Sequence, residues 1–140
     1  MSRPMSVSSA RTATVIFDTD VLIWVARRNA KAIRLVKEAE VRRASIITIM
    51  ELLRGVRNRR ELQDAKSFLR EYDFEVLPLT ENIGHRAAVY VEEYCLQVDL
   101  GVADALIAAT AVENDLPLTS GNAKHFSVVE GLDLRPFTIV

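Results

Sequence analysis

The sequence has few of the residues that usually mark disulfide or zinc chemistry. It contains one cysteine, Cys95, which excludes an intrachain disulfide framework and a cysteine-rich zinc site. Its two histidines, His85 and His125, are too few for a zinc cluster built on histidine. These absences favour an intracellular protein, and we expect a cytoplasmic one, in which any metal ion is bound through oxygen ligands.

Long apolar runs, aromatic residues and excess charge are also scarce. No apolar stretch approaches the roughly 20 residues of a membrane span, and the serine-rich segment 1–11 lacks the apolar core of a signal peptide. Aromatic residues make up 6% of the chain, so a stacking platform for single-stranded RNA is not evident. The formal net charge is -1, so any surface that binds nucleic acid must be local.

The remaining composition is ordinary for one globular domain. The chain has 140 residues, of which 49% are hydrophobic and 26% charged. We expect residues 1–12 to form a flexible N-terminal tail and residues 13–140 to form a single domain.

Short apolar runs alternate with amphipathic segments along the chain. We predict strands at 13–17, 45–47, 74–77, 116–119 and 134–140, and helices at 21–28, 30–40, 48–56, 61–72, 81–96 and 102–113. Pro136 suggests that the last strand lies at an edge of the sheet. This alternation predicts an α/β fold, a three-layer α/β/α sandwich around a central, mainly parallel sheet of about five short strands.

Three carboxylates interrupt segments that are otherwise apolar. They are Asp18 after the run 15–17, Glu51 within 49–53, and Asp104 within the alanine-rich segment 102–109. A buried carboxylate is unfavourable unless it is paired or binds a metal. Three of them suggest one shared site for Mg²⁺ or Mn²⁺, ions that prefer oxygen ligands. Because such an ion activates a bound water for attack on phosphorus, the pattern indicates phosphodiester hydrolysis.

Each of these acids also has a structural explanation. Asp18 could be a helix N-cap, although Thr19 and Asp20 compete for that role. Glu51 stands three residues after Thr48, as a capping box requires. Asp104 would complement the dipole at the start of a helix. Both the structural and the metal-binding interpretation stay open at this point.

Four segments in series resemble the motifs of PIN-domain ribonucleases. They are residues 15–23, 45–55, 102–111 and 116–126, the last a short strand followed by a turn. The pattern is similar to that of the VapC-type toxins of type II toxin–antitoxin systems. The resemblance implies a PIN fold and an endoribonuclease that depends on Mg²⁺ or Mn²⁺. It also implies a cognate VapB-type antitoxin and a homodimer that can join a higher toxin–antitoxin assembly.

By motif position, Asp18, Glu51 and Asp104 are the expected catalytic and metal-binding acids. The fourth motif differs, because many members of the family carry an acid there and this chain has Asn122 and His125 instead. Asn122 is expected to ligate the metal or to position a water, unless it is only a turn residue. The departure implies one tightly bound metal, with a second that binds only together with substrate.

Basic residues follow Glu51 closely. Arg54 and Arg57 are three residues apart, so a helix through both would place them on one face. We expect them to contact RNA phosphates, or alternatively an acidic segment of an antitoxin. Thr119 is a further candidate for RNA contact, unless it only ends its strand.

Two other functions stay open from the sequence. A catalytically weak PIN binding module fits the absence of a fourth acid. A phosphatase of the haloacid dehalogenase type would use Asp18 as its nucleophile. Against that second alternative, Leu22 stands where that family favours threonine or valine, and the chain is short for its fold.

Overall fold

The computed structural model describes residues 14–139, which build one five-stranded sheet in the order β3-β2-β1-β4-β5. The strands are β1 (Thr14–Phe17), β2 (Val41–Ser45), β3 (Glu75–Leu77), β4 (Leu118–Ser120) and β5 (Leu134–Pro136). All four neighbouring pairs are parallel. The predicted parallel sheet is therefore confirmed, and β5 lies at an edge, as Pro136 suggested. The expected tail at 1–12 lies outside the described residues.

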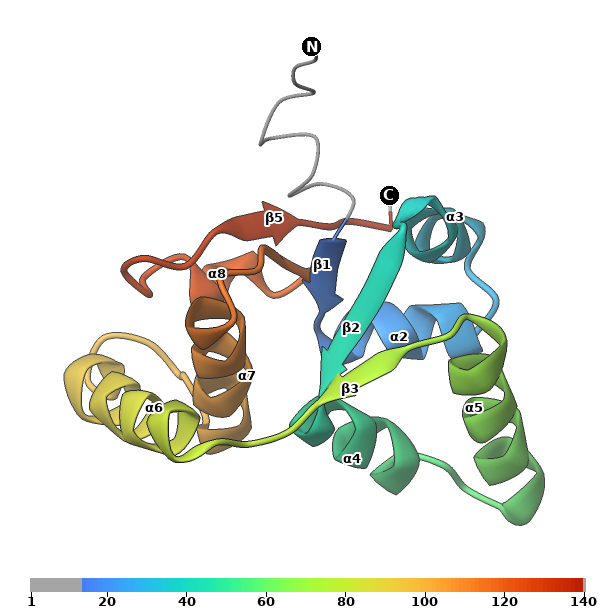
Figure 1. Ribbon diagram of the computed structural model, residues 1–140, viewed down its shortest axis with the longest axis horizontal. Helices are drawn as coiled ribbons and strands as arrows, with labels where there is room; N and C mark the ends of the chain where they lie inside the picture. The colour runs from blue at the N-terminus through green and yellow to red at the C-terminus, as the bar shows by residue number, and fades with distance from the viewer. Residues whose placement is uncertain (1–13, 140) are drawn as a thin grey trace, which may run out of the picture.

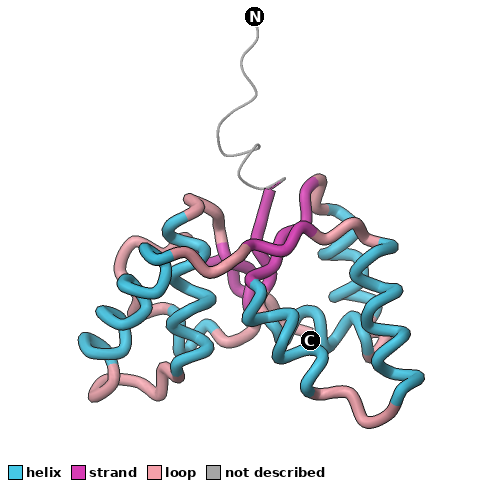
Figure 2. The backbone as a smooth tube through the Cα atoms, turned by 60° about the horizontal axis from the view of Figure 1, so that its bottom comes forward, coloured by secondary structure: helices cyan, strands magenta, loops and turns pink. Residues whose placement is uncertain are grey.

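Helices cover both faces of this sheet. They are α2 (Thr19–Ala26), α3 (Ala30–Glu38), α4 (Ile46–Arg54), α5 (Arg59–Glu71), α6 (Glu81–Tyr94), α7 (Val102–Glu113) and α8 (Ala123–Phe126). Figures 1 and 2 show α6 and α7 on one side of the strands and α2, α3 and α5 on the other. The structure thus confirms the three-layer α/β/α sandwich. Within residues 14–139, the helices are too short or too polar to cross a lipid bilayer.

Strand β1 supplies side chains to both halves of the core. Ile16 packs in the cluster formed with α6 and α7, whereas Val15 and Phe17 pack in the cluster formed with α2, α3 and α5. Successive side chains of a strand point to opposite faces, so one central strand can anchor both layers. Ile16 and Phe17 are fully buried. This anchoring fixes the carboxyl end of β1, where Asp18 follows.

Helix α7 can approach the sheet closely because most of its buried residues are alanines. Ala105, Ala108, Ala109 and Ala111 are all fully buried, and the helix also packs against α6. The first turn of α7, which carries Asp104, is thereby held near the sheet. The predicted bounds of this helix are confirmed, as is its start after Gly101.

The second strand differs from the prediction at 45–47. Strand β2 covers Val41–Ser45, with Val41 paired to Thr14 of β1. The polar residues Arg42 and Arg43 concealed this strand in the sequence, because both find their partners only in the folded chain. Arg42 donates to the backbone carbonyls of Val36, Lys37 and Tyr72, and Arg43 forms an ion pair with Glu75.

The capping box predicted from Thr48 to Glu51 is wrong. Helix α4 begins at Ile46, and Ser45 is its N-cap, with Oγ accepting from the Ile47 amide at 3.0 Å. Thr48 is fully buried inside the first turn. Because β2 ends directly at the helix, the serine that closes the strand is also the residue that can cap the helix. Glu51 is therefore released from the structural role that the sequence suggested.

Smaller differences concern helix ends. Helix α5 begins at Arg59 rather than at 61, because Asn58 caps it by accepting from the Glu61 amide. The Thr80 cap of α6 is confirmed, with Oγ1 accepting from the Ile83 amide at 3.2 Å. The last strand stops at Pro136, where the prediction extended it to 140.

Candidate active site

Four acidic side chains line one hollow beside the carboxyl ends of β1 and β4. The hollow has a volume of about 330 Å³, and its lining consists of Asp18, Thr19, Asp20, Ile23, Glu51, Asp104, Gly121 and Asn122. Ligand sites of parallel sheets usually form at this end of the strands. The structure thus brings together Asp18, Glu51 and Asp104, which are far apart in the chain, and adds Asp20 to them.

Asp18 is the most deeply buried of these acids, with 4% of its surface exposed. It is the N-cap of α2, since its Oδ1 accepts from the Thr19 amide at 2.8 Å. Of the three residues that compete for this cap in the sequence, Asp18 is the one that takes it. The other oxygen, Oδ2, accepts from the Ser120 hydroxyl at 2.7 Å. Burial raises the pKa of Asp18 to about 7, although the Ser120 hydrogen bond opposes the rise.

Ser120 and Asp20 are site residues that the sequence did not identify. The Ser120 hydroxyl donates to Asp18 and accepts from the backbone amide of Asn122 at 2.9 Å, so it links the end of β4 to the buried acid. Asp20 Oδ2 accepts from the Gly121 amide at 2.9 Å. The signal available in the sequence was weak, namely polar residues near the carboxyl ends of two short strands.

Asp20 has one carboxylate oxygen without a protein partner. Its Oδ1 is buried, and within residues 14–139 no hydrogen-bond donor reaches it. Burial raises the pKa of Asp20, while the Gly121 amide opposes the rise. A buried carboxylate oxygen is unfavourable without a donor or a cation. This atom is therefore an available ligand position in the hollow.

Helix α4 packs against α2 and brings Glu51 to the hollow. Glu51 Oε1 accepts from the Thr19 hydroxyl at 2.6 Å. This bond links the first turn of α2 to α4, and it holds the glutamate carboxylate beside the residue that follows Asp18.

Asp104 faces the fourth motif. Its side chain is 25% exposed, and its Oδ2 lies 3.8 Å from Nδ1 of His125. That imidazole nitrogen also lies 3.0 Å from the amide nitrogen of Asn122. Burial raises the pKa of Asp104, the nearby charge of Glu51 raises it further, and His125 lowers it.

The donor set of this hollow fits a divalent cation that binds oxygen. None of the described residues that line it is basic, and the pKa values of Asp18, Asp20 and Asp104 are all raised, first by burial. As the side chains stand, the part of the chain that is described contains no cluster of three or more histidine, cysteine or acidic residues already spaced to hold a metal. The carboxylate oxygens of the hollow are thus suitable ligands for a metal ion, although their present spacing is too wide. Binding of an ion would draw the carboxylates closer together.

The predicted RNA-contact residues are more dispersed than expected. Arg54 is exposed in the last turn of α4, but Gly55 ends that helix, so Arg57 is not on the same helical face. Arg57 instead forms an ion pair with Glu61 at 2.7 Å. The side chain of Thr119 is buried, and its backbone carbonyl accepts from the Asp18 amide at 2.9 Å.

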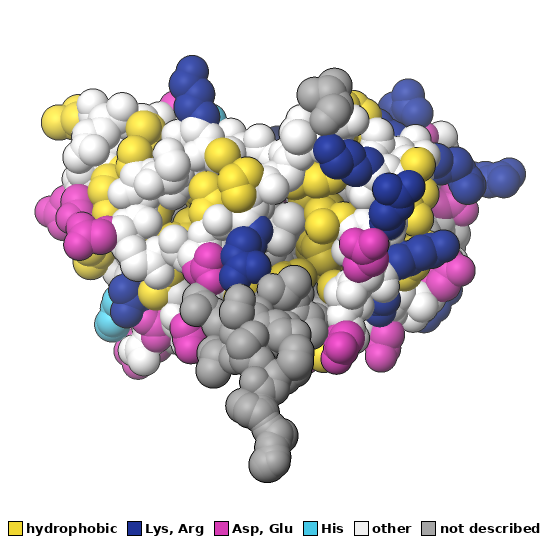
Figure 3. All heavy atoms as spheres, turned by 90° about the horizontal axis from the view of Figure 1, so that it is seen from above, with side chains coloured by type: hydrophobic (Ala, Val, Ile, Leu, Met, Phe, Trp, Pro, Cys, Tyr) yellow, Lys and Arg dark blue, Asp and Glu magenta, His cyan; other side chains and the backbone are white. Residues whose placement is uncertain are grey.

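Charge is distributed unevenly over the surface. Figure 3 shows lysine and arginine side chains gathered mainly over one half of the visible face, the half on which α3 lies in Figure 1. Helix α3 contributes Lys31, Arg34 and Lys37 to this half of the molecule. The acidic hollow is thus accompanied by a separate basic region, as a protein that approaches a polyanion requires.

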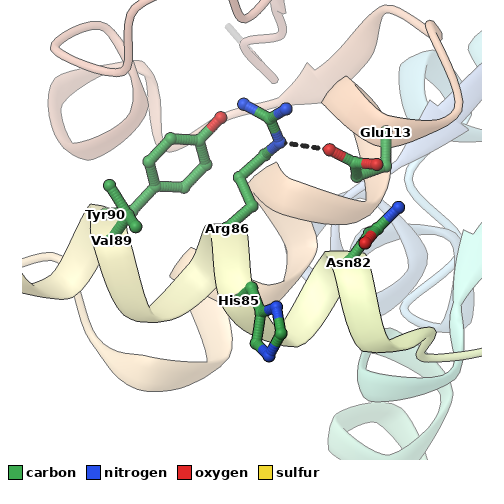
Figure 4. Close-up of a pocket in the computed structure, with 6 residues that line it drawn as sticks. All are labelled: Asn82, His85, Arg86, Val89, Tyr90 and Glu113. Atoms are coloured by element: carbon green, nitrogen blue, oxygen red, sulfur yellow. Dashed lines mark hydrogen bonds and ion pairs between the residues drawn. The ribbon is translucent and has the colours of Figure 1, made fainter.

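A larger hollow of about 480 Å³ lies between α6 and α7 (Figure 4). It is lined by Asn82, His85, Arg86, Val89, Tyr90 and Glu113. Its only acid among these residues, Glu113, already accepts from Arg86 at 2.5 Å. The presence of four acids and no basic residue among the residues that line it therefore distinguishes the smaller hollow as the candidate active site.

Comparisons with known proteins agree with this fold. The PIN domain family model matches residues 15–132. Ribonuclease VapC10 from Mycobacterium tuberculosis is 36% identical over 98 residues, which cover 68% of this chain and 69% of that protein.

Solved structures are similar as well. A toxin–antitoxin complex from Klebsiella pneumoniae matches with a TM-score of 0.74 and 26% identity, over 91% of this chain and 98% of the other. The crystal structure of VapBC2 from Rickettsia felis, bound to a DNA fragment from their promoter, matches with a TM-score of 0.76 and 16% identity. This match covers 89% of this chain and 99% of the other chain. At this low identity it shows a shared fold and nothing more.

Proposed function

This chain belongs to the PIN domain family and, within it, to the VapC ribonucleases, and from that premise we propose that Asp18, Glu51 and Asp104 hold a divalent ion where RNA is hydrolysed. The protein is a VapC-type toxin of a type II toxin–antitoxin pair, and its activity is that of an endoribonuclease. We propose Mg²⁺ or Mn²⁺ as the ion, since both accept ligand sets rich in carboxylate.

The convergence of acids in one hollow carries this proposal. Carboxylates from the end of β1 and from α2, α4 and α7 line it together. Neighbouring negative charges at such close quarters are unfavourable, and a bound cation would relieve them. When bound, a divalent ion lowers the pKa of a water ligand and neutralises charge on the phosphate and the leaving oxygen.

The protein itself positions the acids. Ser120 and the Thr19 amide fix both oxygens of Asp18, and the Thr19 hydroxyl holds Glu51. Asn122 follows Ser120 at the rim, where we propose that it positions a water or ligates the ion. The second metal that the fourth motif implied would join only with substrate, because that motif supplies Asn122 and His125 in place of a carboxylate.

RNA contact is proposed for Arg54 first. It is exposed at the end of the helix that carries Glu51, so it lies one turn further along α4. Arg57 is a weaker candidate because Glu61 engages its guanidinium. Thr119 acts on the site through its backbone bond to Asp18 rather than through its buried side chain.

The partner of this toxin is a VapB-type antitoxin. The complex from Klebsiella pneumoniae, 26% identical, is a toxin–antitoxin pair and supports this partner. We also propose a homodimer, because exposed apolar side chains such as Leu96 and Val102 are available for self-association. Light scattering of the purified chain would measure its mass in solution, and a monomer at all concentrations would refute the dimer. The proposed compartment is the cytoplasm, where the RNA substrate is found.

Cleavage of RNA tests the proposed function directly. Purified protein, freed of antitoxin, is incubated with total RNA and Mg²⁺ or Mn²⁺, with EDTA as one control. Discrete fragments are expected from the unmodified protein and from Asp115→Asn, a matched change at an exposed helix end. They are expected to disappear with EDTA and with Asp104→Asn.

Intact RNA in every reaction would contradict the proposed nuclease activity and favour the catalytically weak binding module. The absence of a carboxylate in the fourth motif supports that alternative. A phosphatase using Asp18 is less compatible with the site. The chain belongs to a different family, whose model matches residues 15–132.

A further inference from the structure

One face of helix α2 leads away from the acidic hollow. Asp20 and Ile23 on this face line the hollow, and Arg27 follows Ile23 by one helical turn. The Arg27 amide donates to the Ile23 carbonyl at 3.0 Å, so Arg27 continues the helical path although α2 ends at Ala26. On the opposite face, Leu22 is fully buried in the core. Figure 1 shows α2 starting beside the end of β1 and running away from the strands, so Arg27 marks the outer end of this face.

The side chain of Arg27 is held in place without being neutralised. Its guanidinium carbon lies 5.4 Å from the centre of the Trp24 ring, within the range of a cation–π contact. Arg27 is exposed, and within residues 14–139 no carboxylate forms an ion pair with it. Arg57, by contrast, is paired with Glu61. Because stacking uses only the flat side of the guanidinium, the N–H groups in its plane remain available for a phosphate.

The position of Arg27 suits a phosphate beside the reacting one. Arg27 comes seven residues after Asp20, which corresponds to about 10 Å along a helix that rises about 1.5 Å per residue. At that distance its guanidinium does not serve the ion itself, but it can contact the strand where it leaves the hollow. The acids of the hollow repel a polyanion, so a free cation at the edge of the site favours the approach of RNA.

We propose that Arg27, stacked on Trp24, binds an RNA phosphate next to the one that is cleaved, so that the exposed face of α2 carries the strand out of the hollow. This inference rests on the proposed ribonuclease function and adds a place and a direction for the substrate. In this arrangement Arg27 is a substrate-binding residue, and Trp24 is a positioning residue that acts through it.

The neighbouring residue Arg28 provides a matched control. Both arginines are exposed at the C-terminal end of α2, where a cation also favours the helix dipole. Arg28 has a φ of 63°, a left-handed conformation, so it does not continue the face formed by Asp20, Ile23 and Arg27. Replacing either arginine by glutamine removes the same charge from the same helix end, but only one replacement removes the proposed phosphate contact.

Binding is measured by fluorescence anisotropy of a labelled single-stranded RNA of random sequence, because a phosphate contact does not depend on the base. Full-length protein freed of antitoxin carries Asp104→Asn to prevent cleavage. In this background, Arg27→Gln is expected to weaken binding by about three- to tenfold. It should also reduce the slope of log affinity against log salt concentration by about 0.7, the value for one contact to a single strand. Arg28→Gln should leave the slope unchanged.

The role of Trp24 is tested by a double-mutant cycle. Trp24→Leu removes the ring but keeps an apolar side chain against the core, and thermal denaturation checks that the variant is folded. Trp24→Leu should weaken RNA binding when Arg27 is present and have no further effect in Arg27→Gln. Arg27→Lys keeps the charge without the planar fork, so it should restore the salt slope and only part of the affinity.

Equal salt slopes for Arg27→Gln and Arg28→Gln would overturn the phosphate contact, while cleavage of total RNA by the unmodified protein would leave the ribonuclease function intact. Additive effects of Trp24→Leu and Arg27→Gln would overturn the positioning role of Trp24 alone. If the unmodified protein neither cleaved total RNA nor bound the labelled RNA in its Asp104→Asn form, the inference would fail together with the proposed function. The three failures are therefore distinguishable.

Discussion

Replacing Asp18 by asparagine is expected to stabilise the metal-free protein at neutral and alkaline pH. The pKa of Asp18 is raised from 3.8 to about 7, mainly by burial. Between these two pH values, the folded protein holds a proton that the unfolded chain has released. The free energy of unfolding therefore falls as pH rises through this window and levels off above about pH 7. At about 1.4 kcal/mol for each pKa unit, the charged carboxylate destabilises the fold by roughly 4 kcal/mol.

An asparagine removes this charge and can keep both contacts of the carboxylate. Its Oδ1 can accept from the Thr19 amide, and its Nδ2 can donate to the Ser120 oxygen, in place of the bonds that Asp18 makes now. Allowing about 1 kcal/mol for each weakened hydrogen bond, we expect a gain of about 2 kcal/mol at pH 8. Urea denaturation in EDTA, repeated at intervals from pH 4.5 to 8.5, measures the free energy of unfolding across the window.

The two proteins should differ in slope as well as in level. The stability of the unmodified protein should decline between about pH 4 and 7, and that of Asp18→Asn should decline less, since the raised pKa values of Asp20 and Asp104 still contribute. Mn²⁺ should then stabilise the unmodified protein more than the variant, because a ligand that binds only the folded state shifts unfolding. Parallel pH profiles, or a variant less stable at pH 8, would refute the reasoning.

Three further changes give separate predictions. Gly121→Ala should destabilise the protein by about 1–3 kcal/mol in thermal denaturation, because a Cβ there would overlap a carboxylate of the hollow and press on a backbone carbonyl. Its control is Gly84→Ala, where nothing lies within 4 Å and a gain of up to about 1 kcal/mol is expected; equal effects would contradict this. Ser120→Ala should lower urea stability by about 1–3 kcal/mol, because a buried carboxylate oxygen and a backbone amide lose their partner; an unchanged midpoint would argue against that role. Arg54→Gln, in the inactive Asp104→Asn background, should weaken RNA binding and reduce the salt dependence by about one phosphate contact, whereas Arg70→Gln on α5 should not; fluorescence anisotropy across a salt series decides.

The fold was largely predictable because its local and long-range signals agree. Apolar runs alternate with amphipathic segments, and caps such as Thr80 mark helix starts from neighbouring residues alone. The exception is β2, whose arginines read as surface residues. Arg42 is satisfied by three backbone carbonyls, one of them from Tyr72, 30 residues away. Such partners exist only in the folded chain, so the pattern of the strand itself could not reveal them.

The site was predictable in its acids and not in the groups that hold them. Asp18, Glu51 and Asp104 are conspicuous because each is a charge in an apolar setting, and all three line the hollow. The roles of Ser120 and Gly121 depend on contacts across 102 and 101 positions of the chain, which no local pattern encodes. Thr48 shows the opposite error, since a valid local motif was overridden when Ser45 capped the helix instead.

The bond between Ser120 and Asp18 also has a consequence for synthesis of the protein on the ribosome. These two residues are separated by 102 positions, so the first acid emerges long before the hydroxyl that fixes it. At a synthesis rate of about 5–20 residues per second, that interval is roughly 5–20 s. Strand β4, which pairs directly with β1, is also missing from the growing chain during this time. Translation products that end before β4 therefore lack an assembled site, and the activity arises only after β4 has been synthesised.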